Sequence, residues 1–290
     1  MNDYVLLTDS SADLTDALVK ELGVEVLPLS FTMRNKTYRN WPDNREIDPK
    51  DFYRQLREGE MATTSAVNVS DFTETIEPHL KAGRDVLVVA FSSGLSATCH
   101  SAQIAAQELS EQYPERKVYV VDSLCASLGQ GLLVWYAARM KNEGRGIGAV
   151  RDWLEENKLH LCHWFTVDDL FFLQRGGRVS GTVAIFGTLL NVKPVMHMDN
   201  EGRLIFVTKV RGRKRSLDAL VERLDQTAIN PSEQSIFITH GDCLEDAQYV
   251  AKKIEEKYHP KEIVINWVDP VIGAHSGPGT VALFFLGTER

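Results

Sequence analysis

The stretches YVLLTD (residues 4–9), DVLVVAF (85–91) and KVYVVD (117–122) determine the fold that the sequence predicts. Each is a continuous apolar run, and each precedes a segment with helical spacing. Strands that are buried on both faces and alternate with helices are typical of a parallel sheet covered on both sides. We therefore predict that the first half of the chain is a Rossmann-like α/β domain.

Other segments of the first half fit this pattern. A further apolar strand is expected at residues 24–31. A helix is expected at residues 48–58, with Asp48 as the N-cap and Pro49 at the first helical position. The remaining helices are predicted at residues 12–22, 95–112, 125–141 and 150–157.

The second half has a different pattern. VKPVMHM (192–198) and RLIFVTKVR (203–211) flank the turn sequence Asp-Asn-Glu-Gly and predict an antiparallel hairpin. We therefore expect a second, α+β domain with a mixed sheet, so that the domains span residues 1–158 and 159–290. Its other elements are predicted strands at 160–167, 235–240, 262–268 and 281–287, helical segments from 168 to about 190, and helices at 213–226 and 245–257.

Charge and composition narrow the class of protein. The 290 residues include 32 basic and 40 acidic side chains, for a net charge of −8, which argues against a general nucleic-acid binder. The four cysteines show no metal or disulfide spacing. No secretory signal and no apolar run of about 20 residues is found, so we expect a cytoplasmic protein. One local basic cluster contains Lys209, Arg211, Arg213, Lys214 and Arg215.

Hydroxyl-rich turns follow three of the predicted parallel strands, at residues 8–11, 92–94 and 122–123. Parallel strands end along one edge of a sheet, where ligands bind. Ser and Asp oxygens at such positions also cap helices, so both interpretations stay open. The turn with Ser93 and Gly94 is the most suggestive, because a glycine between strand and helix lets backbone amides face an anion.

Two further motifs could contribute to a site. Arg175-Gly176-Gly177-Arg178 is either a loop of ion-paired arginines or a loop that approaches a ligand closely. His275 lies in AHSGPG, where we expect a tight turn, and packing alone rarely requires an imidazole there. No phosphate-binding loop, nucleophile elbow or metal cluster is recognised, so we expect no cofactor and no metal.

Eight segments distributed over the whole chain carry a resemblance: TDSSADL (8–14), TTSAV (63–67), FSSGLSAT (91–98), VVDS (120–123), LQRGGRVS (173–180), VKPV (192–195), KVRGRKR (209–215) and IGAHSGPGTVALFFLG (272–287). By the order and spacing of these segments, the chain resembles the DegV family, the fatty-acid-binding subunits of bacterial fatty acid kinase systems. The motif after Thr64-Ser65 departs from the family pattern, since Ala66-Val67-Asn68 stands where Gln-Pro-Ser is usual.

The resemblance implies a function without catalysis by this chain. One long-chain fatty acid would lie in a buried tunnel, and a partner fatty acid kinase would convert its carboxylate to an acyl phosphate. Transient contact with a membrane surface is also possible for such a carrier. The residues implied are Thr64, Ser65, Ser93, Gly94 and His275 at the carboxylate, Arg175 near the head group, and Arg211 and Arg213 for docking of the kinase.

Two other functions stay open from the residues alone. The chain could be an enzyme, a serine hydrolase or phosphotransferase that uses Ser93 with His275. It could also be a regulatory module that senses an acyl ligand.

Overall fold

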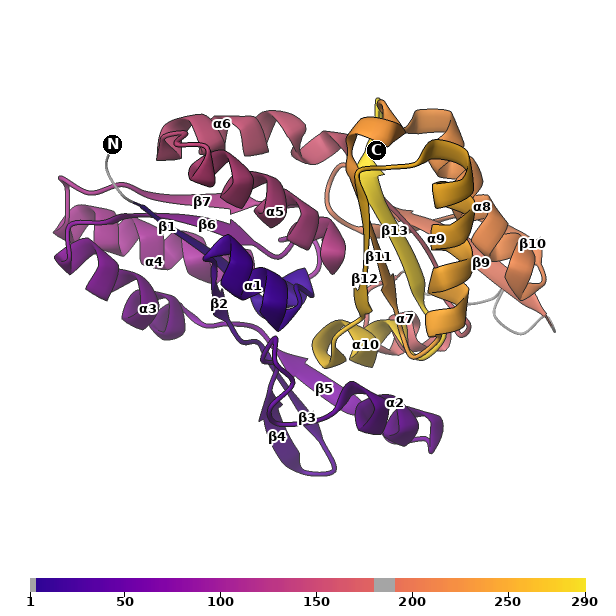
Figure 1. The fold of residues 1–290 in the computed structure, drawn as a ribbon. Coiled ribbons are helices and arrows are strands. Elements are labelled where there is room, and N and C mark those ends of the chain that lie inside the picture. Colours follow the sequence, from indigo (N-terminus) through magenta and orange to yellow (C-terminus); the bar gives the residue numbers. More distant parts are fainter. Residues whose placement is uncertain (1–3, 180–190) are drawn as a thin grey trace.

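The computed structural model describes residues 4–179 and 191–290, and its first half is built on a parallel sheet (Figure 1). The strand order is β2-β1-β6-β7, and all three pairings are parallel. Every residue of β1 and β6 is buried, which confirms the predicted sheet with two covered faces. The strands are β1 (Tyr4–Asp9), β2 (Glu25–Leu27), β6 (Asp85–Ala90) and β7 (Val118–Asp122).

Helices cover both faces of this sheet, because alternate residues of each strand point to opposite sides. Leu6 and Leu87 pack in one apolar core with α5 and α6, whereas Leu7 and Val88 pack in another with α3 and α4. Helix α3 was not predicted, although Asn68 and Asp71 form a capping box at its start. The helices are α1 (Asp16–Leu22), α3 (Val69–Lys81), α4 (Thr98–Gln112), α5 (Leu128–Asn142) and α6 (Ile147–Asn157).

An arm projects from this first half (Figure 1), and its strand at Ala62–Ser65 was not predicted. The prediction of a single strand at residues 24–31 is wrong, because this segment divides around Pro28 into β2 and β3. Proline has no N–H for a sheet ladder, so the chain leaves the parallel sheet there. The arm consists of β3 (Ser30–Met33), β4 (Lys36–Arg39) and β5 (Ala62–Ser65) in an antiparallel sheet, with α2 (Pro49–Arg57) capped by Asp48 as expected.

The second half is a six-stranded mixed sheet, as predicted, in the order β10-β9-β8-β13-β11-β12. Its β9–β10 hairpin is confirmed. Leu217 and Val250 of α8 and α9 pack on one face of this sheet, while α5 of the first half packs on the other, with Gly129 against Phe284. The elements are β8 (Leu161–Thr166), α7 (Phe171–Arg175), β9 (Val192–Met198), β10 (Leu204–Arg211), α8 (Arg213–Thr227), β11 (Ser235–His240), α9 (Leu244–Tyr258), β12 (Glu262–Trp267), α10 (Pro270–Ser276) and β13 (Val281–Leu286).

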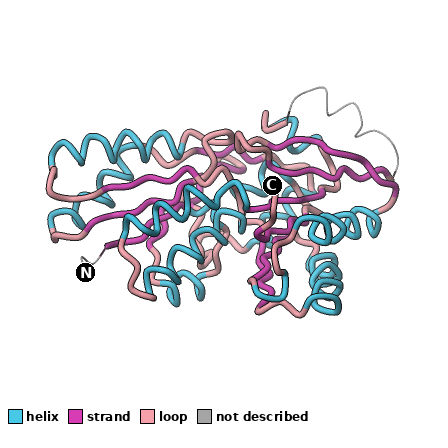
Figure 2. The backbone as a smooth tube through the Cα atoms, turned by 90° about the horizontal axis from the view of Figure 1, so that it is seen from above, coloured by secondary structure: helices cyan, strands magenta, loops and turns pink. Residues whose placement is uncertain are grey.

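The two halves lie side by side (Figure 2), and α5 of the first half contacts β8, β11 and β13 of the second. A domain boundary near residue 158 stays a prediction, and the helical segment expected up to about residue 190 lies partly outside the described residues. Among the helices of the described ranges, none is both long and apolar enough to span a bilayer.

Two buried carboxyl groups lie where the halves meet. Asp13 follows β1, and Asp269 immediately precedes α10. The Asp13 carbonyl accepts a 2.7 Å hydrogen bond from Asn266 Nδ2, which ties the first half to β12. Burial raises the pKa of Asp13, and the nearby Asp269 raises it further. Burial also raises the pKa of Asp269 to about 7, so these carboxyls favour the protonated form.

This junction predicts a pH dependence of stability. A carboxyl whose pKa is raised by folding stabilises the fold fully below its unfolded pKa, and the contribution is lost as pH rises through the folded value. For Asp269 that window runs from 3.8 to about 7. Relative to the wild type, Asp269→Asn should therefore gain about 4 kcal/mol of unfolding free energy across this window.

Urea unfolding at several pH values measures this gap. The control Asp152→Asn replaces an exposed carboxylate and should change the free energy of unfolding far less. A gap for Asp269→Asn that stays constant across these pH values would contradict the raised pKa.

Candidate functional site

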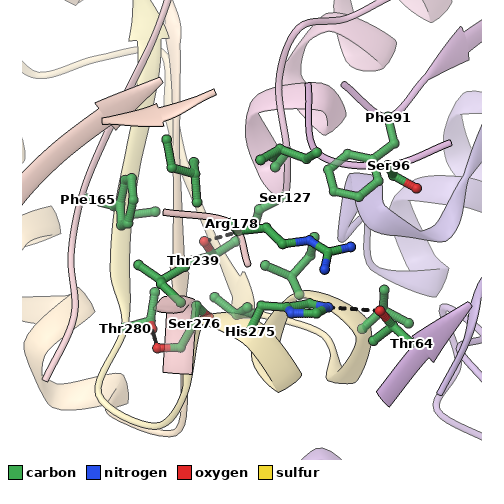
Figure 3. Close-up of a pocket in the computed structure, with 18 of the residues that line it drawn as sticks. Thr64, Phe91, Ser96, Ser127, Phe165, Arg178, Thr239, His275, Ser276 and Thr280 are labelled. Carbon is green, nitrogen blue, oxygen red and sulfur yellow. Dashed lines mark hydrogen bonds between the residues drawn. The ribbon is translucent and has the colours of Figure 1, made fainter. Parts of the chain in front are cut away.

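A cavity of about 260 Å³ lies between the two halves (Figure 3). Its walls come from segments far apart in the sequence: the loop after β6, the residues before α5, strands β8 and β13, and helix α10. Most of the lining is apolar, which suits a hydrocarbon better than a polar metabolite. The larger apolar side chains are Phe91, Leu95, Phe165, Leu173, Leu204, Val268, Val271 and Ile272.

Three polar side chains meet at one end of the cavity. Thr64 Oγ1 of β5 lies 2.8 Å from His275 Nε2 of α10, within hydrogen-bond distance. Figure 3 shows the imidazole pointing at Thr64 and the Arg178 guanidinium on the same side of the cavity. We call Thr64, Arg178 and His275 the polar mouth. It combines a hydroxyl, an imidazole and a cation at the end of an apolar chamber.

The charges of the polar mouth follow from its burial. Desolvation, with a smaller effect of the Arg178 charge, lowers the pKa of His275 to about 4, so the imidazole is neutral near pH 7. Burial also lowers the pKa of Arg178, but a guanidinium remains protonated in proteins. Among the described lining residues, one fixed positive charge therefore faces the cavity, and it suits a single anionic group.

Gly176 fixes the position of the imidazole. A Cβ atom at this residue would overlap His275 Nδ1, so only glycine permits this close approach. The Gly176 carbonyl also accepts a hydrogen bond from Arg178 Nη1. Of the two interpretations of the Arg-Gly-Gly-Arg loop, the structure favours the one in which the loop approaches a site closely.

The two arginines of that loop have different places. Arg175, expected near the head group, ends α7, is exposed and stacks over the Phe172 ring at 4.5 Å. It does not line the cavity, whereas Arg178 does. The prediction of Arg175 at the head group therefore selected the wrong guanidinium of the motif, because the motif itself does not show which arginine turns inward.

His275 lies in the last turn of α10 and not in a tight turn, so that expectation is wrong. The tight turn comes directly after it, at Gly277 and Gly279, both with positive φ. A helical position gives the imidazole a fixed direction toward β5.

The other residues expected at the carboxylate lie elsewhere. Ser65, Ser93 and Gly94 are exposed and are not among the described residues that line the cavity. The Ser93 N–H donates to Asp122 Oδ1 at 3.2 Å. The loop that contains Ser93 and Gly94 is attached to the β9–β10 turn, since the neighbouring Ser92 Oγ donates to the Gly202 carbonyl at 2.7 Å. The next residues along the loop, Leu95 and Ser96, do face the cavity.

The other two hydroxyl-rich turns bond mainly within the protein. The Asp9 carboxylate accepts hydrogen bonds from the Phe91 and Ser11 N–H groups, at 2.8 and 3.1 Å. Asp122 Oδ1 accepts one from the Leu124 N–H at 3.0 Å. For these turns, the structure favours the interpretation as backbone caps.

The two arginines expected to dock a partner lie outside the cavity lining. Arg213 pairs with Asp246 at 2.8 Å and with Asp168 at 3.7 Å. Arg211 ends β10 and is exposed. Arg213 is therefore part of an ion-pair network, while Arg211 is open to solvent.

Comparison with known proteins gives consistent matches. A family model described as "Uncharacterised protein, DegV family" matches residues 4–288. A DegV domain-containing protein of Clostridium perfringens is 48% identical over 290 residues, which cover 100% of this chain and 99% of that protein.

Two solved structures are also similar. A DegV family protein from Thermus thermophilus, described by its fatty acid binding, has 33% identity and a TM-score of 0.89, with 99% of this chain and 100% of that chain covered. Bacillus subtilis DegV, described as a fatty acid binding protein, has 30% identity and a TM-score of 0.86, with coverage of 99% and 100%.

The geometry at Gly176 predicts a destabilised variant. Gly176→Ala forces a Cβ against the His275 ring, and we expect it to cost about 1–3 kcal/mol of unfolding free energy, as overpacking does. The control Gly148→Ala places its Cβ in open space and should change stability by less than about 0.5 kcal/mol. Denaturant unfolding measures both, and equal stabilities would contradict the close contact.

Proposed function

The chain belongs to the DegV family, and from this premise we propose that it binds one long-chain fatty acid in the cavity, with the carboxylate at the polar mouth. The observation that carries the proposal is an apolar chamber that ends at a half-buried cation beside a neutral imidazole and a hydroxyl. An acyl chain with one terminal negative charge has the matching distribution of polarity.

The apolar walls would supply the larger part of the affinity. About fifteen methylenes, at about 0.8 kcal/mol each, gain about 12 kcal/mol on burial. Association costs about 4–15 kcal/mol, so close packing of the tail is needed. The cavity of about 260 Å³ is slightly smaller than the roughly 300–1,000 Å³ of ordinary ligand pockets, so a long tail would displace some lining side chains.

The polar mouth would supply the head-group contacts. Arg178 can donate charge-assisted hydrogen bonds to a carboxylate, and Thr64 can donate one through its hydroxyl. A bound carboxylate would raise the low pKa of His275, because an adjacent negative charge favours imidazolium. Ser65 adjoins Thr64, and Ser93 and Gly94 precede the cavity-lining Leu95, so we keep these three as proposed contacts after a local loop movement.

We further propose that a partner kinase phosphorylates the bound carboxylate. A second cavity of about 240 Å³ shares Thr64, Arg178 and His275 with the first and adds the exposed Met61 and Arg175. The polar mouth therefore forms a wall between a chamber for the tail and a space that an outside group can enter. The exposed Arg211 remains a candidate for docking, and the cytoplasmic location and membrane contact stay predictions.

The enzymatic alternative has less support. A serine nucleophile needs a base within hydrogen-bond reach. Within the described part of the chain, His275 Nε2 lies 2.8 Å from Thr64 Oγ1, and Ser93 is exposed outside the cavity lining. This arrangement fits the presentation of a ligand better than serine catalysis.

The pair of arginines in one loop provides a direct test of binding. Arg178→Gln should weaken fatty acid binding by at least about tenfold, because it removes a charge-assisted hydrogen bond to the carboxylate. The matched control Arg175→Gln should stay within about twofold, because Arg175 lies on the outer surface. Displacement of a fluorescent fatty acid measures both affinities, and equal losses would place the carboxylate elsewhere.

A second test concerns the partner kinase. With fatty acid at saturation, His275→Gln should lower the rate of acyl-phosphate formation by about tenfold or more, since it removes an imidazole next to the reacting oxygen. The control His160→Gln replaces a histidine outside the cavity lining and should keep the wild-type rate. A wild-type rate in His275→Gln would refute the role of His275 in transfer.

A further inference from the structure

The cavity has a second polar feature, His163 of β8, which no part of the proposed function uses. His163 lines the cavity and is only 4% exposed. Its Nδ1 atom is buried and has no hydrogen-bond partner among the described residues. Its ring lies between aromatic neighbours, 4.7 Å from Phe284 and 5.5 Å from Phe165.

His163 lies at the end of the cavity away from the polar mouth. Strand β8 runs from Leu161 to Thr166 and continues into α7 and the loop that carries Arg178. Phe165 is therefore nearer to that loop, and His163 is two residues, or about 7 Å, further along the strand. The pairing with β13 agrees, because Phe165 is opposite Ala282, while His163 is opposite Phe284, further from α10.

If the cavity wall contacts only hydrocarbon, the unpaired nitrogen of His163 destabilises the folded protein. An unsatisfied buried polar group costs about 1–3 kcal/mol, and a phenylalanine would fill the same aromatic environment without it. Desolvation, with smaller effects of Arg290 and His197, lowers the pKa of His163 to about 3, so its ring is neutral. A neutral imidazole has one donor and one acceptor nitrogen, and a hydroxyl group can complement either of them.

Two hydroxyls that also line the cavity differ from His163. Ser127 Oγ and Thr239 Oγ1 both line the cavity, but they lie 3.0 Å apart and bond to each other. Ser127 also bonds to the Asp13 carboxylate. These groups are satisfied within the protein, so His163 is the better candidate for recognition of a ligand.

We propose that His163 makes the cavity selective for hydroxylated long-chain fatty acids, whose chain hydroxyl forms a hydrogen bond with the imidazole. This inference rests on the proposed function, since the carboxylate at the polar mouth sets which part of the chain reaches His163. An unsubstituted chain leaves the imidazole nitrogen unpaired, whereas the hydroxylated chain satisfies both groups.

Competition binding with stearic acid and with hydroxystearic acids, substituted at mid-chain or at the terminal carbon, tests this selectivity. The wild type should bind at least one hydroxylated acid about tenfold more tightly than stearic acid. His163→Phe should lose this preference and bind stearic acid at least as well as the wild type. His197→Phe is a matched control, because its ring stacks on Trp164, which points to the other face of the sheet, and the preference should remain.

The outcomes separate this inference from the proposed function. If the wild type binds stearic acid as tightly as every hydroxylated acid, the selectivity is refuted while fatty acid binding stands. A preference that persists in His163→Phe also refutes it. If no acid binds, the proposed function itself fails. The affinities of the wild type for stearic acid and for the hydroxystearic acids test the selectivity even if His163→Phe does not fold.

Discussion

The hydrogen bond between Thr64 and His275 joins parts of the molecule that are 211 residues apart in sequence. Thr64 belongs to the arm, and His275 belongs to α10 of the second half. The arm is held against α10 nearby, where the Tyr53 hydroxyl donates to the Val268 carbonyl at 2.6 Å and packs closely on Gly273. The polar mouth exists only while this docking holds, so the position of the arm determines the geometry of the head-group site.

Burial acts in opposite directions on the titratable groups around the cavity. It lowers the pKa of His275 and His163 and so keeps both imidazoles neutral, while it raises the pKa of Asp269 toward the protonated form. Among the described residues that line the cavity, Arg178 is the one that keeps a charge under these conditions. This lining thus offers one cation among neutral donors and acceptors. A ligand with one carboxylate neutralises that cation, whereas a dianion or a neutral lipid would leave an unbalanced charge.

The parallel sheet could be predicted from sequence because its strands are buried on both faces and read as continuous apolar runs. Strand β5 could not, because Ala62–Ser65 alternates between half-buried and exposed residues and has no apolar pattern. Thr64 therefore entered the prediction only through the resemblance. A local signal did exist for α3, in the capping box of Asn68 and Asp71, and for the division of β2 from β3, in Pro28.

The choice between Arg175 and Arg178 shows why the rest of the site could not be predicted from the sequence. The motif is symmetrical, with one arginine on each side of two glycines. Because α7 ends at Arg175, that side chain stays on the helix surface, and only the residue after the glycines can turn toward the cavity. This turn depends on the contact of Gly176 with His275, about a hundred residues later in the chain. His163 is similar, since an imidazole within a strand has no sequence signature until the cavity beside it is known.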